Sequence, residues 1–232
     1  MRISQLLSPR ALALGTALAV GAATAEAQPI GTLNTAGSFR FTNMGGNLFI
    51  NILPRAEADG QVVADPFAQT GDFESVAGQV GRMRDFNPSV GANSVPNFLT
   101  VGPFIFDLGF VGPGTFGSGE CGASAASGQT CTVAGTAINQ VNLTANQSTF
   151  SFRFTGSARE GEMGATVPFR GLFTAQFNRN FQDVNRLARE GGIETTFSAT
   201  ITTVPEPATV TLMGVGVLAL AGVAARRRRA TA

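Results

Sequence analysis

Residues 148–155 read Ser-Thr-Phe-Ser-Phe-Arg-Phe-Thr, and this stretch decides the fold class of the chain. Phenylalanine alternates with polar residues, which is the period-two pattern of a β-strand that buries one face and exposes the other. The chain holds 19 phenylalanines among its 232 residues. Because each phenylalanine contributes about 1.5–3 kcal/mol when it is buried, the face that carries these rings is expected to form the core.

The same alternation recurs in three other segments. In residues 104–110 the alternation places Phe110 on the same face as Phe104 and Phe106. The other two segments that alternate in this way are residues 173–177 and 197–201. Each of these segments is expected to be a half-buried strand. Shorter β-forming runs, separated by glycine, proline, asparagine and aspartate, predict further strands over residues 38–42, 47–53, 73–80 and 139–144.

One segment has a different period. Residues 180–190 place apolar side chains at helical intervals, and Gly191-Gly192 ends the pattern. We therefore predict an all-β chain whose domain is an antiparallel β-sandwich or jelly roll with one short helix. No repeat of fixed period is visible, which disfavours a propeller or a solenoid.

The first 27 residues have the layout of a secretory signal peptide. Arg2 and Arg10 make a basic start, residues 11–23 are apolar, and Ala25-Glu26-Ala27 is a small-x-small cleavage site. Cleavage is expected between Ala27 and Gln28. The segment has no twin arginine, which favours the general secretion route.

The last 29 residues hold three consecutive features. Val204-Pro205-Glu206-Pro207 is followed by an uncharged apolar run over residues 208–225 and then by Arg226, Arg227, Arg228 and Arg229. A helix of this run would measure about 27 Å, which is enough to cross a hydrocarbon core. The arginines would stay on the cytoplasmic side by the positive-inside rule, so the rest of the chain is expected beyond the inner membrane.

Between these signals lies one exported domain, residues 28–203. It holds ten arginines and thirteen carboxylates, a net charge of −3, and this does not favour a nucleic-acid-binding protein. We divide the chain into a signal peptide (1–27), an exported β domain (28–203) and a sorting signal (204–229). The sorting signal comprises a motif (204–207), a transmembrane helix (208–225) and a basic tail (226–229).

Cys121 and Cys131 are the two cysteines of the chain. In an exported protein two nearby cysteines are expected to form a disulfide, here pinning a loop rich in glycine, serine and alanine. The bridge should be worth roughly 3 kcal/mol in the chain-entropy model. The spacing does not favour a redox role, which would prefer Cys-x-x-Cys, or a metal pair.

The composition restricts enzymatic chemistry. The chain has no histidine, tyrosine, tryptophan or lysine, so catalytic triads, Schiff bases and histidine-ligated zinc are excluded. A pair of carboxylates, as in glycosidases, is the alternative that remains. The carboxylates available for such a pair form two groups, namely Glu57, Asp59, Asp65, Asp72, Glu74 and Asp85, and Glu160 with Glu162.

No cofactor is predicted, and one segment offers a weak candidate site for Ca²⁺. Glu57-Ala58-Asp59-Gly60 places oxygen ligands beside a turn glycine, and Asp65 could join them, but the spacing is not that of an EF-hand. Asn142 and Asn146 lie in glycosylation sequons and are expected to be strand-edge or turn residues.

The C-terminal arrangement resembles the PEP-CTERM sorting signal of exported bacterial proteins, with Pro205, Glu206, Pro207, the apolar run and the arginines in the matching positions. The resemblance implies an exosortase as a partner that cuts near the motif, transient anchoring in the inner membrane, and later display at the cell surface or release. It also implies association with extracellular polysaccharide.

Features of the domain are similar to those of PEP-CTERM proteins of unassigned function. They are the segment Thr70–Phe73 ahead of the strand that starts at Phe98, the cysteine loop and the strand over residues 169–173. The leading hypothesis is a non-enzymatic surface or matrix protein that binds or supports exopolysaccharide in biofilm. The alternatives are a carboxylate-dependent carbohydrate-active enzyme and a self-assembling surface-layer subunit.

Overall fold

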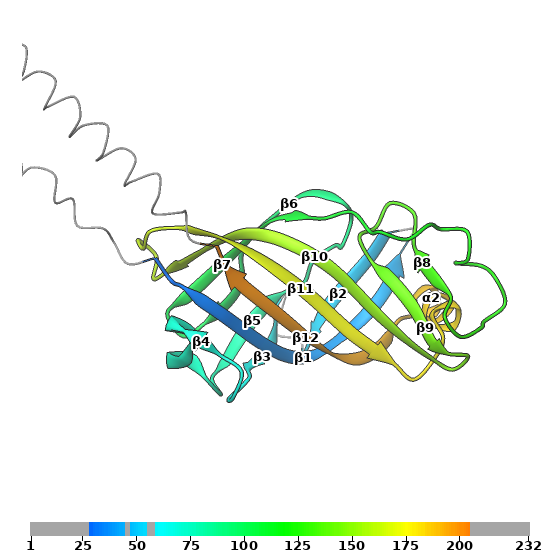
Figure 1. Cartoon of the computed structure of the whole chain (residues 1–232), viewed down its shortest axis with the longest axis horizontal. Coiled ribbons are helices and arrows are strands. Elements are labelled where there is room, and N and C mark those ends of the chain that lie inside the picture. The colour runs from blue at the N-terminus through cyan, green and yellow to red at the C-terminus, as the bar shows by residue number, and fades with distance from the viewer. Residues whose placement is uncertain (1–27, 45–46, 55–58, 205–232) are drawn as a thin grey trace, which may run out of the picture.

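The computed structural model describes residues 28–44, 47–54 and 59–204, which form one antiparallel sheet, one α-helix and one 3-10 helix (Figure 1). The elements in chain order are β1 (Gly31–Met44), β2 (Asn47–Leu53), β3 (Asp59–Ala64), β4 (Thr70–Gly71), η1 (Asp72–Val76), β5 (Val80–Arg84), β6 (Gly91–Val101), β7 (Phe104–Val111), β8 (Thr130–Thr132), β9 (Asn139–Thr144), β10 (Gln147–Glu160), β11 (Val167–Phe177), α2 (Phe181–Glu190) and β12 (Ile193–Thr203).

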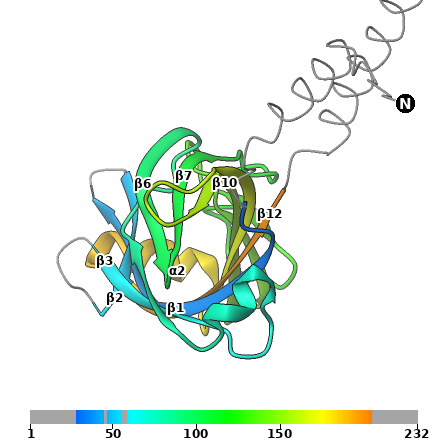
Figure 2. The ribbon, with the colours of Figure 1, turned by 90° about the vertical axis from the view of Figure 1, so that its left-hand side faces the viewer.

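The sheet closes into a barrel of eight strands (Figure 2). Hydrogen-bonded neighbours follow the order β11-β12-β1-β3-β5-β6-β7-β10, and β10 pairs with β11 to complete the ring. β2 and β4 pair with β1, and β9 and β8 extend from β10. The expected antiparallel β domain with one short helix is confirmed, but the sandwich or jelly-roll arrangement is wrong.

Long, coiled strands explain why one sheet closes on itself. β10 has 14 residues and pairs with β7, β9 and β11 along different parts of its length. Its register with β7 shifts between Thr155 and Gly156, and such irregularities increase the local twist of a strand. The period-two pattern is the same in a sandwich and in a barrel, so the alternation of residues could not separate the two.

Phenylalanine rings fill the interior. Eleven of the twelve largest fully buried side chains among the described residues are phenylalanines. The ring of Phe173 is stacked between those of Phe152 and Phe197, with centroids 4.9 and 4.6 Å away. An interior packed in this way is a core, so a ligand site has to be sought on the outer face.

α2 lies at the end of the barrel that also carries β8 and β9 (Figure 1). The helix confirms the prediction: the Asn180 side chain accepts the Asp183 N–H at its start, and Gly191 ends it with φ 137°. Phe181, Val184 and Ala188 are buried. On the exposed side, hydrogen bonds to Asp183 and Glu190 raise the pKa of the Arg186 guanidinium.

η1 occupies residues that were expected to form a strand, so the predicted strand over 73–80 is wrong. Phe73 and Val76 lie three residues apart and are both buried, because side chains at i and i+3 face the same way on a 3-10 turn. The Phe73 ring centroid lies 4.8 Å from that of Phe104. The next strand, β5, begins only at Val80.

β7 contains a second difference from the expected pattern. Leu108 pairs with Gly156 while Phe110 pairs with Thr155, so Gly109 is an extra residue on the β7 side. This bulge reverses the alternation, and Phe110 is 43% exposed whereas Val111 is buried. The expectation that Phe110 belongs to the core is therefore wrong.

The two ends of the domain leave the barrel together. β1 and β12 are antiparallel neighbours, and Thr32 near the start of β1 pairs with Thr202 near the end of β12. The expected signal peptide (1–27) and the sorting residues from Pro205 onward, including the apolar run 208–225, lie outside the described residues. Within the part of the chain that the structure describes, no helix has the length and apolarity needed to cross a membrane.

Candidate functional site

The junction between the barrel and the sorting segment is fixed by hydrogen bonds. Thr203, the last residue of β12, accepts the Gly31 N–H with its hydroxyl at 2.9 Å and donates to the Gly31 carbonyl at 3.2 Å. The Val204 N–H donates to the Pro168 carbonyl at 2.8 Å. Val204 is therefore still bound to the barrel, and Pro205 follows it directly.

The start of the domain is held at the same end. The Ile30 N–H donates to the Asp72 carboxylate at 2.7 Å, and the Thr32 N–H donates to the Thr70 hydroxyl at 2.9 Å. The Gln28 side chain donates to the Thr166 carbonyl at 3.1 Å. The Thr70–Phe73 segment therefore fastens the first strand. Ala25 and Ala27 of the expected cleavage site lie outside the described residues.

An open groove of about 1050 Å³ lies on the outer side of the sheet. Its floor is formed by outward-facing side chains of three adjacent strands, with β10 and β12 on either side of β11. The floor includes Thr149, Ser151, Arg153, Thr174, Gln176 and Ser198. Sequence reasoning missed this site, because its residues come from distant strands and alternate with the core phenylalanines.

The segment after β7 forms one wall of the groove. Gly112, Pro113, Thr115 and Phe116 line it. The Phe116 N–H donates to the Thr132 hydroxyl at 3.1 Å, and that hydroxyl donates to the Asn139 side-chain oxygen at 2.9 Å. The same oxygen of Asn139 accepts the Thr115 N–H at 2.7 Å. The wall is thus tied to β8 and β9 without any ligand.

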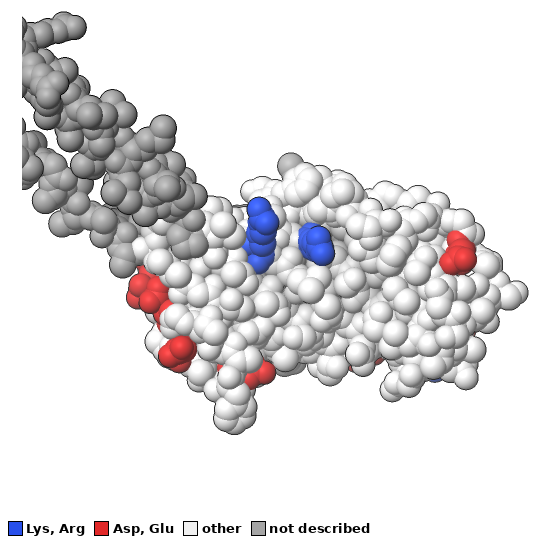
Figure 3. Space-filling view, in the orientation of Figure 1, with Lys and Arg blue, Asp and Glu red and all other residues white. Residues whose placement is uncertain are grey.

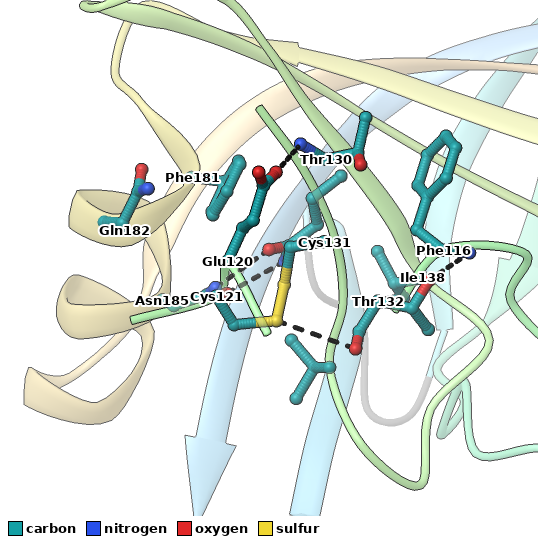
Figure 4. Close-up of a disulfide and its surroundings, with 12 residues drawn as sticks. Phe116, Glu120, Cys121, Thr130, Cys131, Thr132, Ile138, Phe181, Gln182 and Asn185 are labelled. Carbon is teal, nitrogen blue, oxygen red and sulfur yellow. Dashed lines mark hydrogen bonds between the residues drawn. A yellow bond between two sulfur atoms is a disulfide. The ribbon is translucent and has the colours of Figure 1, made fainter. Parts of the chain in front are cut away.

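The disulfide supports this wall from behind (Figure 4). Cys121 and Cys131 are bridged, which confirms the pairing predicted from the sequence. The Cys121 sulfur lies 3.6 Å from the Thr132 carbonyl oxygen, and the Glu120 carboxylate accepts the Thr130 N–H at 2.8 Å. The disulfide therefore fixes the position of Thr132, and the hydroxyl of Thr132 holds the groove wall through the Phe116 N–H.

Side-chain amides join the cysteine loop to α2. Gln140 and Asn185 exchange two hydrogen bonds of 2.9 and 2.8 Å. Asn142 is fully buried, donates to Gln129 and Gln182, and accepts the Phe181 N–H at 2.9 Å. Asn142 is therefore a structural residue and cannot present its side chain for glycosylation in the folded protein, whereas Asn146 is exposed.

The groove carries positive charge and no carboxylate. Arg153 on β10 is exposed, and Arg170 lies one diagonal step away, because Thr155 pairs with Arg170 and Arg153 with Leu172. Figure 3 shows basic groups on this face, and acidic groups near the ends of the molecule and along its lower edge. Neither arginine takes part in an ion pair between described residues, unlike Arg84, Arg159 and Arg186.

Four carboxylates of the first candidate group, namely Asp59, Asp65, Asp72 and Asp85, each make a structural contact of their own. Asp59 is 3.5 Å from Arg84, and Asp65 accepts the N–H groups of Phe67 and Ala68. Asp85 accepts the Ile52 N–H at 2.7 Å. Glu57, a proposed Ca²⁺ ligand, lies outside the described residues. Among the residues that are described, no group of three metal-binding side chains is present.

Glu160 is the last residue of β10, and Glu162 lies two residues beyond it. Glu160 pairs with Phe104, and Glu162 approaches Arg159 at 4.0 Å. Arg159 also forms a salt bridge with Asp107, whose other oxygen accepts the Asn97 N–H at 2.6 Å. Asn97, with φ 50°, is held in the left-handed region by this contact and by a hydrogen bond from Arg159.

Comparison with known protein families gives one match, the PEP-CTERM protein-sorting motif at residues 203–229. It includes Pro205, Glu206, Pro207 and Arg226 to Arg229, and it begins at the last residue of β12. No curated protein and no solved structure matches the chain. The match supports an exported protein that is targeted to an exosortase.

Proposed function

We propose that the chain is exported by its signal peptide, is held in the inner membrane by residues 208–225, and is cut by an exosortase near Val204–Pro207. The barrel is then displayed at the cell surface or released. The observation that carries this proposal is the position of the sorting motif, which starts where the last strand of the barrel ends.

The junction supports a cut that leaves the barrel intact. The strand pairs of the described barrel lie between Gly31 and Thr203, and the last anchoring hydrogen bond is that of Val204. A cut beyond Val204 removes none of these contacts. The disulfide also agrees with an exported protein, since disulfides persist in oxidising compartments.

We assign the barrel a non-enzymatic role, without a cofactor, in an extracellular matrix of exopolysaccharide or biofilm. A groove that offers hydroxyl, amide and guanidinium groups beside the apolar side chains of Phe116 and Leu172 suits a polyhydroxylated ligand. Asp59, Asp65, Asp85 and Asp107 are used in ion pairs or backbone contacts, which supports a structural use of these carboxylates.

Fractionation of producing cells tests the role. The protein should be recovered with the extracellular polysaccharide and should be released when that polysaccharide is degraded. Ordered arrays formed by the purified protein without polysaccharide would point instead to a surface-layer subunit. New reducing ends produced from the polysaccharide by the purified protein would point to a carbohydrate-active enzyme.

A further inference from the structure

Two unpaired cations mark the outer face of β10 and β11. Arg153 and Arg170 are exposed diagonal neighbours, and no ion pair of the described chain includes either of them. The exported domain has a net charge of −3, so unneutralised positive charge on this face is not a consequence of overall composition. An arginine pair is suited to carboxylate or sulfate groups, which it can bind through paired N–H donors.

Hydroxyl groups continue from these cations along the groove. Thr149 and Ser151 lie on the same face of β10 as Arg153, and Thr174 and Gln176 lie beside them on β11. Alternate residues on a strand are spaced by about 6.6–6.8 Å, and neighbouring strands by about 4.8 Å. These rows offer donors and acceptors at regular intervals to an extended chain that carries hydroxyl groups.

We infer that this groove binds an acidic polysaccharide. Arg153 in the groove and Arg170, its diagonal neighbour just outside the lining residues, pair with the anionic groups, and the threonine, serine and glutamine side chains bind the hydroxyls. The inference rests on the proposed function and specifies its ligand and site. Two arginines on an acidic domain are few for a nucleic acid, which is bound through a dense basic surface. The chain also lacks tyrosine and tryptophan, so apolar contact in the groove is limited to side chains such as Phe116 and Leu172, and hydrogen bonds and charge select the ligand.

The test variant is Arg153→Gln/Arg170→Gln. The controls are the protein with both arginines unchanged, the single variant Arg82→Gln, and the double variant Arg153→Gln/Arg82→Gln, which removes the same net charge as the test variant. Arg82 is exposed on β5, on the side of the ring opposite β11, and has no ion pair within the described residues. All samples are full chains in detergent with Arg226 to Arg229 changed to glutamine, so that the tail adds no charge. The probes are polygalacturonate, dextran sulfate, dextran and double-stranded DNA.

We expect polygalacturonate or dextran sulfate to bind and dextran to bind more weakly. The Arg153→Gln/Arg170→Gln variant should lose about two- to thirtyfold in affinity, as two exposed ion pairs would give. Arg82→Gln should bind with unchanged affinity. Arg153→Gln/Arg82→Gln should lose only the part of the affinity that Arg153 contributes. Binding should also weaken with added salt.

Three results would overturn the inference. Equal losses in both double variants would show a response to net charge alone. Dextran binding as tight as that of polygalacturonate and dextran sulfate would show a site that does not use charge, and stronger binding of DNA would show a different ligand class. In each case the proposed function stands if the protein still fractionates with the matrix. Absence of the protein from the matrix would contradict the proposed function, whatever the binding results are.

Discussion

Gly171 on β11 lies directly opposite Phe154 on β10, and the ring of Phe154 occupies the space in which a side chain at Gly171 would stand. The Phe154 ring is buried and also packs against the ring of Phe169, with centroids 5.9 Å apart. The close approach of these two strands, which seals the barrel, therefore depends on the absence of a side chain at Gly171.

Gly171→Ala should destabilise the barrel. The added methyl group would displace the Phe154 ring in a packed core, and such overpacking costs about 1–3 kcal/mol in free energy of unfolding. Thermal unfolding should show a Tm lower by several degrees. Gly117→Ala is the matched control, because a Cβ there meets nothing within 4 Å. Equal Tm values for the two variants would contradict the packing described here.

Because of the β7 bulge, two phenylalanines of the same strand differ in burial. Phe106 is fully buried, whereas Phe110 is 43% exposed. Phe106→Ala should cost about 3–5 kcal/mol in free energy of unfolding, while Phe110→Ala should cost less than about 1 kcal/mol. Urea unfolding measures both. Similar losses would mean that the strand keeps a regular alternation and that the bulge is absent.

The disulfide should stabilise the barrel by roughly 3 kcal/mol, since it closes a short loop in the unfolded chain. Cys121→Ala/Cys131→Ala should lower the urea midpoint accordingly. A reductant should lower the midpoint of the unaltered protein to about the same value and leave that of the variant unchanged. Because Cys121 lies beside Thr132, the variant should also bind acidic polysaccharide more weakly.

The buried amide network predicts different roles for the two sequon asparagines. Asn142→Ala would leave the buried Phe181 N–H without its acceptor and would remove the hydrogen bonds to Gln129 and Gln182, and a buried unsatisfied group costs about 1–3 kcal/mol. Asn146→Ala, at an exposed turn, should be nearly neutral. Hydrogen exchange should show faster exchange at the start of α2 in the first variant alone.

Sequence periodicity was sufficient for the strands that bury regular rows of phenylalanine. The segments over 148–155, 173–177 and 197–201 lie in β10, β11 and β12, and the helix at 180–190 matches α2. These elements follow from local pattern and caps. β3 and β5 were missed because their sequences contain no phenylalanine, and only the end of β6, from Phe98, was expected as a strand.

The remaining differences depend on contacts between distant residues. Closure of the sheet requires β10 to pair with β11 and β7 at once, and the alternation of one strand does not record its partners. The bulge at Gly109 depends on the register with Gly156. The groove is assembled from outward residues of three strands, which in the sequence look like ordinary solvated positions.

The tail, by contrast, could be interpreted from sequence alone. Its proline motif, apolar run and arginine cluster are contiguous, and the match at residues 203–229 agrees with that interpretation. A sorting signal of this kind is recognised along the chain, so no tertiary contact is needed to identify it. The structure adds that the barrel ends where the signal begins.

Intact-mass and terminal-peptide analysis of the protein from cells and medium, with and without the exosortase, distinguishes exosortase processing from permanent anchoring. We expect a mature form that starts at Gln28 and ends between Val204 and Pro207, and that is absent when the exosortase is deleted. A protein that keeps Arg226 to Arg229 in both strains would contradict it and would indicate a permanent membrane anchor.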